Sequence, residues 1–191
     1  MLNQLAERAS TYGYRVVALQ ELEGVKAVGG LMLIPKRSIN SKDLTPQRSR
    51  ETDVKVLTVN KPSELRLSNR ILRALDVVEL DFKVFSEGAA RKALSKLVNT
   101  RKPVMVNFSE VLDAILSRRD LSGLYALLSL YERGSLTLVL GSGARELREV
   151  HHPVVYYSLL QELGLSEAKA LSTLTANPLS VLRSAGFNIT L

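Results

Sequence analysis

An apolar run, Leu136-Thr137-Leu138-Val139-Leu140, leads directly into the turn Gly141-Ser142-Gly143-Ala144, and Arg145 and Arg148 follow it. The run has the length and composition of a buried strand, and the residues after the turn predict closely spaced helices. A strand that opens into a glycine turn and a helix is how α/β proteins present backbone amides to anions. Glycine is also required wherever a tight turn needs a positive φ angle, so two explanations for this turn stay open.

The same pattern of strand and helix recurs roughly every 25 residues before this turn, which predicts parallel β-α units with helices on both faces of one sheet. Right-handed crossovers would curl such a series into a barrel or a doubly wound sheet, and we favour the barrel. Pro35 is expected to end the second strand, and Ser63 and Ser109 are expected to cap helices. Strands are predicted at residues 14–19, 28–34, 54–59, 77–80, 104–108 and 136–140, and helices at 2–12, from Ser63 to Leu75, 86–98, 110–116 and 121–132.

The residues that follow the turn predict helices almost to the end of the chain. Pro153 is a plausible first helical position, Gly164 would end that helix, Ser166 would cap the next one, and Asn177-Pro178 would start a third. Because strands no longer alternate with helices here, an eight-strand barrel would be incomplete.

Composition limits the class of protein. The 191 residues, 46% of them hydrophobic, suffice for one domain with a single core. The absence of cysteine excludes disulfides, thiolate catalysis and the common zinc modules built on cysteine. The first residues lack the apolar core of a signal peptide or membrane span, so we expect a cytoplasmic protein without membrane contact. Twenty-six Lys and Arg against 19 Asp and Glu give a net charge of +7, which favours a polyanionic partner such as nucleic acid.

Basic residues follow most of the predicted strands, and on a barrel these positions share one rim. A cationic rim without an acid, base or metal ligand suits a phosphate backbone better than turnover. Tryptophan is absent and other aromatic residues are few, so binding of a folded RNA by shape and phosphate is favoured over base stacking. Other cations lie in the basic segment 35–53 and on helices, where Arg66, Arg70 and Arg73 form one stripe. The predicted RNA-binding residues are Lys36, Arg37, Arg48, Arg50, Lys61, Arg66, Arg70, Lys83, Arg91, Arg145 and Arg148.

Few residues offer catalytic chemistry. The adjacent histidines at 151–152 point in different directions, so an N-cap and a surface imidazole before Pro153 explain them better than a metal site does. Ser142 lacks the GxSxG frame of a nucleophile. Glu79 and Asp81 lie on one face of a predicted strand, where one of them could orient a basic side chain.

A series of short segments, each weak alone, resembles a known family in order and spacing and covers most of the chain. The segments resemble the archaeal ribonuclease P protein component 3, which is related to the thirty-kilodalton subunit of the eukaryotic enzyme. Residues 1–191 are accordingly expected to form a single domain of this family. The segments are Gly13-Tyr14-Arg15-Val16-Val17-Ala18-Leu19, Asn69-Arg70, Val77-Val78-Glu79-Leu80, Val106-Asn107-Phe108-Ser109-Glu110-Val111-Leu112, Ser142-Gly143-Ala144, Leu147-Arg148, Pro153, Leu163-Gly164 and Asn177-Pro178.

The resemblance implies a TIM-barrel-like fold of the polymerase and histidinol phosphatase type, without the metal site of those phosphatases. It implies a non-catalytic subunit of ribonuclease P, a ribonucleoprotein endonuclease whose RNA removes the 5′ leader from precursor tRNA, so the protein alone is expected to be inactive. The protein would bind no cofactor, and the partner RNA would use magnesium. The implied partners are ribonuclease P RNA, precursor tRNA indirectly, and a second small protein subunit in a heterotetramer.

One departure from the family concerns the beginning of the sequence. Family members open with a strand that carries an acidic residue, whereas this sequence starts at the next helix, either because its start was assigned late or because the form is reduced. We therefore expect a barrel that lacks this strand, leaves residues 14–19 at an exposed edge and has a helical C-terminal region.

Two other functions stay open. A small metal-free barrel enzyme could bind a phosphorylated metabolite at Gly141 to Gly143, with Asp81 or Glu79 as its base. The chain could also be a scaffold whose cations only keep it dissolved.

Overall fold

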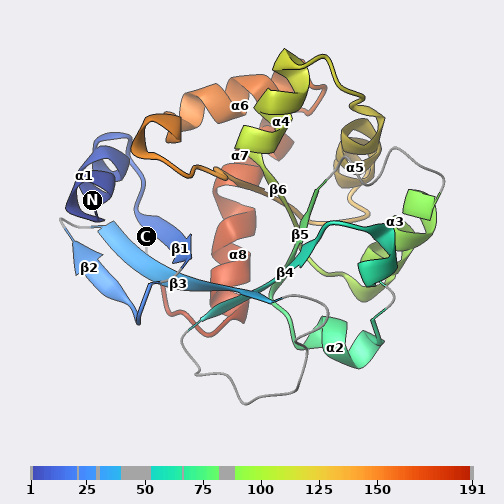
Figure 1. Ribbon diagram of the computed structural model, residues 1–191, viewed down its shortest axis with the longest axis horizontal. Helices are drawn as coiled ribbons and strands as arrows, with labels where there is room; N and C mark the ends of the chain where they lie inside the picture. Colours follow the sequence, from blue (N-terminus) through green and yellow to red (C-terminus); the bar gives the residue numbers. More distant parts are fainter. Residues whose placement is uncertain are drawn as a thin grey trace.

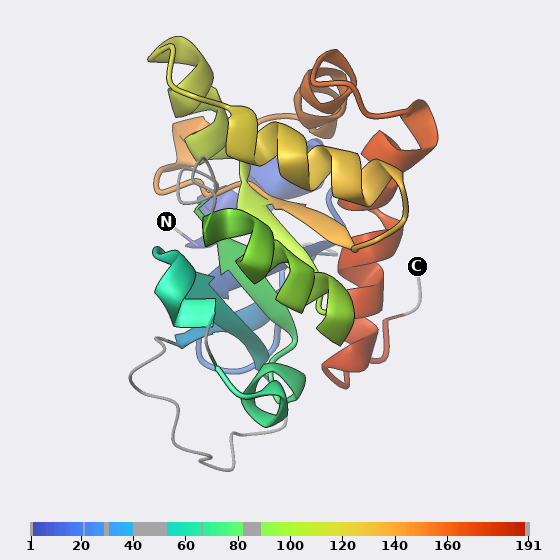
Figure 2. The same cartoon turned by 90° about the vertical axis from the view of Figure 1, so that its right-hand side faces the viewer.

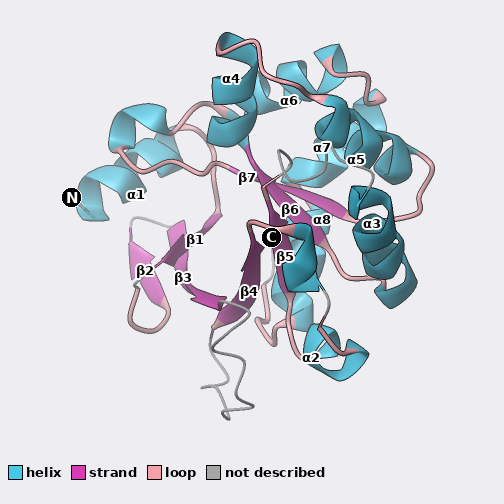
Figure 3. Cartoon of the chain, turned by 45° about the vertical axis from the view of Figure 1, so that its right-hand side comes forward, coloured by secondary structure: helices cyan, strands magenta, loops and turns pink. Residues whose placement is uncertain are grey.

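The computed structural model describes residues 2–20, 22–28, 31–39, 53–65, 67–81 and 89–189, and their strands form one curled sheet. β2 is antiparallel to β3, and every other pairing is parallel. Within the described residues β1 and β7 do not pair with each other, so the sheet is a half-barrel (Figure 1 and Figure 3). The barrel-like α/β fold and the edge position of the first strand are thus confirmed. The strands are β1 (Val16–Gln20), β2 (Lys26–Val28), β3 (Leu31–Ile39), β4 (Val54–Val59), β5 (Val77–Leu80), β6 (Val104–Asn107) and β7 (Leu138–Gly141).

Helices cover both faces of this sheet. α8 lies along the concave face, whereas α2 to α7 lie on the convex side and α1 covers the outer face of β1 and β3 (Figure 1 and Figure 2). Within the described ranges, no helix combines the length and the apolar run needed to cross a bilayer. The helical elements are α1 (Leu2–Thr11), η1 (Pro62–Leu65), α2 (Asn69–Arg73), α3 (Ala89–Thr100), α4 (Phe108–Leu116), α5 (Ser122–Glu132), η3 (Leu147–Glu149), α6 (Pro153–Glu162), α7 (Glu167–Leu174) and α8 (Ala176–Ser184).

Strand alternation divides the core side chains between the two faces of the sheet. Val77 of β5 and Met105 of β6 pack with Val181 of α8 in the inner layer. Val78 and Leu80 of β5 belong to the larger outer layer, which the convex-side helices cover. Because both faces are buried, the strands read as continuous apolar runs in the sequence.

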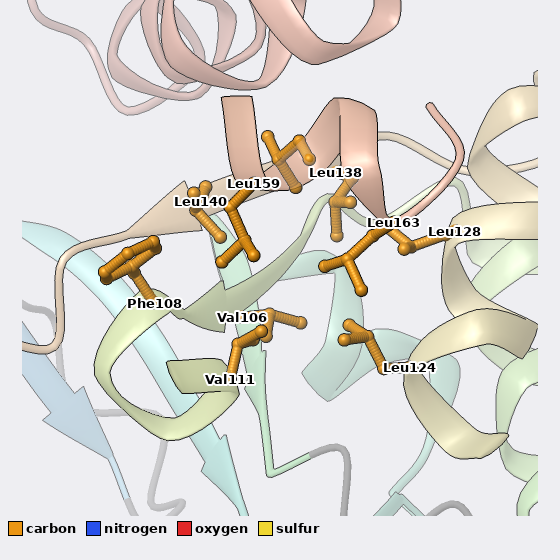
Figure 4. A pocket seen from close by; sticks show the side chains of 10 residues that line it. Val106, Phe108, Val111, Leu124, Leu128, Leu138, Leu140, Leu159 and Leu163 are labelled. Atoms are coloured by element: carbon orange, nitrogen blue, oxygen red, sulfur yellow. The ribbon is translucent and has the colours of Figure 1, made fainter. Parts of the chain in front are cut away.

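A narrow pocket in the outer layer lies between β6, β7 and helices α4, α5 and α6. All of its lining side chains are apolar, and Figure 4 shows Val106, Leu138, Leu159 and Leu163 pointing toward one another around it. A ligand site would normally add a few convergent polar groups to such a lining. We therefore assign this pocket to core packing.

The second predicted strand is wrong in its boundaries. One strand ended by Pro35 was expected at residues 28–34, but Val28 ends β2 and Leu31 begins β3, which pairs antiparallel with β2 and continues past the proline. β1 pairs with β3 across Pro35, and the Met32 amide donates to the Arg15 carbonyl on that side, so alternation directs the proline nitrogen to the opposite side. There β2 pairs with β3 before Pro35 and β4 pairs with it after Pro35, so the missing N–H falls between the two pairings. Lys36 and Arg37 therefore lie in a strand and not in the expected basic loop, whose residues 40–52 lie outside the described residues.

The predicted caps at Ser63 and Ser109 are also wrong. The chain forms the short η1 where a helix from Ser63 was expected, and α2 begins later with Ser68 as its N-cap. The Ser68 hydroxyl accepts a hydrogen bond from the Ile71 amide at 3.4 Å. Ser109 lies within α4, which begins at Phe108. Its hydroxyl donates to the carbonyl of Gly143, in a turn distant in the sequence, at 3.1 Å.

Asn177 starts the last helix near the position that the sequence predicts, and its side chain anchors α8 to the sheet. Its Nδ2 donates to the Leu138 carbonyl at 2.7 Å and to the Tyr131 hydroxyl at 2.9 Å. The Tyr131 hydroxyl in turn donates to the Lys169 carbonyl at 3.0 Å. One amide group therefore joins α8 to β7 and, through Tyr131, to α5 and α7.

Replacing Asn177 by alanine is expected to lower the free energy of unfolding by about 2 kcal/mol, because the Leu138 carbonyl loses its side-chain donor in a partly buried site. Urea denaturation followed by circular dichroism measures the loss. Asn99→Ala, at an exposed position of α3, is the control and should stay within about 0.5 kcal/mol of the wild type. Equal losses in the two variants would contradict the anchoring role of Asn177.

Candidate functional site

Three polar side chains meet on the concave face, just above the apolar inner layer. Lys36 of β3 donates from Nζ to Glu79 Oε2 at 2.6 Å, and Asn107 of β6 donates from Nδ2 to Glu79 Oε1 at 2.8 Å. The side chains of Lys36 and Glu79 are 18% and 13% exposed, and Asn107 is 9% exposed. These residues form a polar layer at the carboxyl-end mouth of the half-barrel, where barrel enzymes hold their catalytic groups.

The contacts within this layer leave little chemistry available to a substrate. Each carboxylate oxygen of Glu79 already accepts a hydrogen bond, and the Lys36 ammonium balances its charge. The expectation that Glu79 or Asp81 orients a basic side chain is confirmed for Glu79. Lys36, expected as an RNA-binding cation, is placed by the structure in this internal ion pair.

The Gly141-Ser142-Gly143 turn packs closely against the start of α4. The Ser109 amide donates to the Ser142 carbonyl at 3.1 Å, and the Ser109 hydroxyl donates to the Gly143 carbonyl at 3.1 Å. Gly143 has φ +63°, and a Cβ atom there would lie 2.7 Å from Asn107 Cβ and would also overlap the Ser109 hydroxyl. A Cβ at Gly141 would lie 2.8 Å from Asn107 Oδ1. Close approach of the backbone, together with the positive φ of Gly143, therefore accounts for both glycines.

The amides that follow this turn already have acceptors within the chain. The Ala144 amide donates to Ser142 Oγ at 3.3 Å, and the Arg145 amide donates to Glu149 Oε2 at 2.7 Å. The hydrogen bond from Arg145 is the largest cause that holds the pKa of Glu149 below its usual value. A phosphate at this position would meet a carboxylate, which weighs against the phosphorylated-metabolite alternative.

The other predicted RNA-binding residues are spread over several parts of the surface. Arg37, Lys61, Arg70, Arg145 and Arg148 are exposed, and Arg148 Nε lies 2.8 Å from Glu146 Oε2. The structure does not bring these residues together on one rim by any described contact. Arg48, Arg50, Arg66 and Lys83 lie outside the described residues, and Arg91 lies in α3 with its side chain outside the description.

The two histidines have structural roles. His152 is the N-cap of α6, and its Nδ1 accepts a hydrogen bond from the Val154 amide at 3.2 Å, which confirms the capping prediction. The His151 ring lies 5.5 Å from the Phe108 ring and 6.2 Å from the Tyr156 ring. In the part of the chain that the structure describes, no group of three or more His, Asp or Glu side chains could hold a metal ion.

Sequence reasoning missed the polar layer as a unit. Asn107 ends an otherwise apolar strand, and a polar residue in a strand buried on both faces is a signal that it has a buried partner. Asn107 and Lys36 donate to the same carboxylate, that of Glu79. The sequence could not reveal this link, because Lys36 was assigned to a loop.

Comparisons with known proteins bear on the fold as a whole. No family model matches the sequence, and no curated protein matches it. Among solved structures, the chain is similar to a chain from the cryo-EM structure of archaeal ribonuclease P with mature tRNA, with a TM-score of 0.78 and 11% sequence identity. The likeness covers 98% of this chain and 91% of that chain. At this identity the likeness shows that the two chains share a fold, and it shows the fold alone.

Proposed function

We propose that this protein is a non-catalytic subunit of ribonuclease P, the ribonucleoprotein that removes the 5′ leader from precursor tRNA. The observation that carries the proposal is the fold likeness to a chain of archaeal ribonuclease P over 98% of this chain. The ordered sequence segments that resemble component 3 of the same enzyme support it independently. The resemblance of the sequence segments and the likeness of the fold therefore point to the same complex.

The charges of the protein suit this role. A net charge of +7 favours a polyanionic partner, and the polar layer at the mouth is occupied by its own ion pair. The protein would supply counter-charge and a rigid surface, and the magnesium-dependent chemistry of hydrolysis would belong to the RNA. The proposed partners are ribonuclease P RNA, precursor tRNA indirectly, and a second small protein subunit in a heterotetramer, within the cytoplasm.

Reconstitution tests this proposal. Precursor-tRNA cleavage is measured with ribonuclease P RNA and the partner protein, with and without this chain, over a range of magnesium concentrations. We expect faster cleavage and a lower magnesium requirement when the chain is present, because its cations reduce repulsion between RNA phosphates. The protein alone should cleave nothing.

Two results would contradict the proposal. One is no stimulation of cleavage, together with equally weak binding to ribonuclease P RNA and to unrelated RNA. The other is turnover of a phosphorylated metabolite by the protein alone, which would favour the barrel-enzyme alternative.

A further inference from the structure

Four cations gather where α2 and α3 end, next to the amino-terminal ends of β5 and β6. Arg70 and Arg73 are exposed on α2 and lie one turn apart. Arg101 is exposed directly after α3, and Lys102 Nζ donates to the Arg73 carbonyl at 3.1 Å. This hydrogen bond brings the end of α3 against the end of α2. We call Arg70, Arg73 and Arg101 the α2–α3 basic face.

Two lysines hold α2 in place beneath this face. α2 has five residues, too few for a helix that is stable by itself. Lys102 Nζ also donates to the Leu75 carbonyl at 2.5 Å, and Lys96 Nζ donates to the Leu67 carbonyl. The segment 67–75 is therefore fixed at both ends, and α2 presents its two arginines from a supported position.

Burial lowers the pKa of Lys102, whereas the nearby Asp76 carboxylate acts in the opposite direction. The Asp76 carboxylate also accepts a hydrogen bond from the Lys55 amide at 2.7 Å. Lys102 and Asp76 are both partly buried beside the face. The exposed charge of the face comes from the three arginines.

Ion pairs among the described residues engage three basic side chains, and the arginines of the face, like Arg37 and Arg118, are not among them. Lys36 pairs with Glu79, Arg119 with Asp113, and Arg148 with Glu146. Among the described residues, no ion pair joins Arg70, Arg73 or Arg101 to an acidic side chain. Their guanidinium groups thus remain available to an external anion, and the planar guanidinium fork matches phosphate geometry well.

The backbone at Arg101 adopts a conformation that is unusual for a residue other than glycine. Its φ angle is +52°, in the left-handed region that disfavours side chains with a Cβ. Among the described residues, six glycines occupy positive φ angles, and the other two residues that do so are Arg101 and Arg118. An arginine therefore stands at position 101 where glycine would fit the backbone better.

From these observations we infer that the α2–α3 basic face binds the phosphate backbone of a folded RNA. The inference rests on the proposed function and adds to it the surface through which RNA is bound. This surface lies at the amino-terminal ends of the strands, at the opposite end from the mouth where the sequence placed a cationic rim. Arg70, Arg73 and Arg101 make the contacts, and Lys96 and Lys102 are positioning residues.

Arg101→Gly and Arg118→Gly form a matched pair for the test. Each substitution removes one positive charge at a positive φ angle, and both native arginines donate their amide to the carbonyl three residues earlier, at 3.1 Å. Arg118 follows α4, which Figure 1 shows at the top, away from α2 at the lower right. Both variants should unfold at the same urea concentration as the wild type or at a higher one.

Binding to a ribonuclease P RNA transcript is measured for both variants over a range of salt concentrations. Arg101→Gly should weaken binding about threefold and reduce the salt slope by about 1, the effect of one lost phosphate contact, whereas Arg118→Gly should match the wild type. The double variant Arg70→Ala/Arg73→Ala should bind RNA about tenfold more weakly, because it loses two phosphate contacts. Since alanine favours the helical conformation, α2 should be kept. All three variants are expected to keep the stability of the wild type, so a loss of stability would not explain their loss of RNA affinity.

The outcomes separate this inference from the proposed function. In one outcome the wild type binds RNA with a steep salt dependence, but Arg101→Gly and Arg118→Gly lose equal affinity. Net charge would then explain binding, and the assignment of RNA binding to the α2–α3 basic face would be wrong. Displacement of the RNA by polyglutamate at equal charge concentration would also overturn it, since the face would then bind acidic polymers in general. A wild type without salt-dependent RNA binding would overturn both the face and the proposed function.

Discussion

Replacing Glu79 by alanine should lower the free energy of unfolding by about 3 kcal/mol, because breaking a largely buried ion pair leaves a charge without compensation. The Lys36 ammonium would lose its counter-ion while only 18% of its side chain is exposed. The Asn107 amide would lose its acceptor at the same time. Urea denaturation at pH 7, followed by circular dichroism, measures the loss.

Glu146→Ala provides the matched control, since it also removes a carboxylate from an ion pair. The side chains of Arg148 and Glu146 are 80% and 58% exposed, so this variant should stay within about 0.5 kcal/mol of the wild type. The double variant Lys36→Met/Glu79→Leu should recover much of the Glu79→Ala loss, because it leaves no unpaired charge. A loss in Glu79→Ala no greater than in Glu146→Ala would contradict the structural role of the pair.

The alternation of strands and helices could be predicted from the sequence because it depends on local composition. Parallel strands buried on both faces read as short apolar runs, and the predicted runs at 54–59 and 77–80 match β4 and β5. Apart from β2, which pairs with β3 off this path, the order of the strands in the sheet follows their order in the chain. The barrel-like architecture could therefore be reached without knowledge of any long-range contact.

The continuation of β3 past Pro35 could not be predicted in this way. Whether a proline interrupts a strand depends on whether a neighbour needs its N–H, and this depends on where β2 and β4 pair with β3. That register is set by residues far away in the sequence. The role of Lys36 was missed for the same reason, because a residue assigned to a loop has no defined face.

The two ends of the half-barrel differ in how their charges are used. At the mouth, Lys36 is neutralised by Glu79 within the protein. At the other end, lysines 96 and 102 support the backbone and leave the arginines of the α2–α3 basic face directed outward. The charge at the mouth is thus balanced inside the protein, whereas among the described residues no ion pair balances the arginines of the α2–α3 basic face.

The Gly141-Ser142-Gly143 turn illustrates the limit of sequence reasoning for the site. Its glycines fit both an anion site and a tight turn, and the two explanations differ only in what approaches the backbone. In the structure Asn107 and Ser109 approach it, and Ser109 precedes Gly143 by 34 positions. No local pattern could have identified that contact.

Replacing Gly143 by alanine is therefore expected to lower the free energy of unfolding by about 3 kcal/mol, from two sources. The positive φ angle costs about 1 kcal/mol for any residue with a Cβ, and the overlap with Asn107 and Ser109 adds about 2 kcal/mol. Gly134→Ala isolates the first source, since Gly134 has φ +73° and no heavy atom within 4 Å of an added Cβ. Urea denaturation of both variants should show a difference of about 2 kcal/mol, and that difference measures the close packing of the turn. Equal losses would mean that the turn can move away from α4, and that the glycine at 143 serves only the backbone angle.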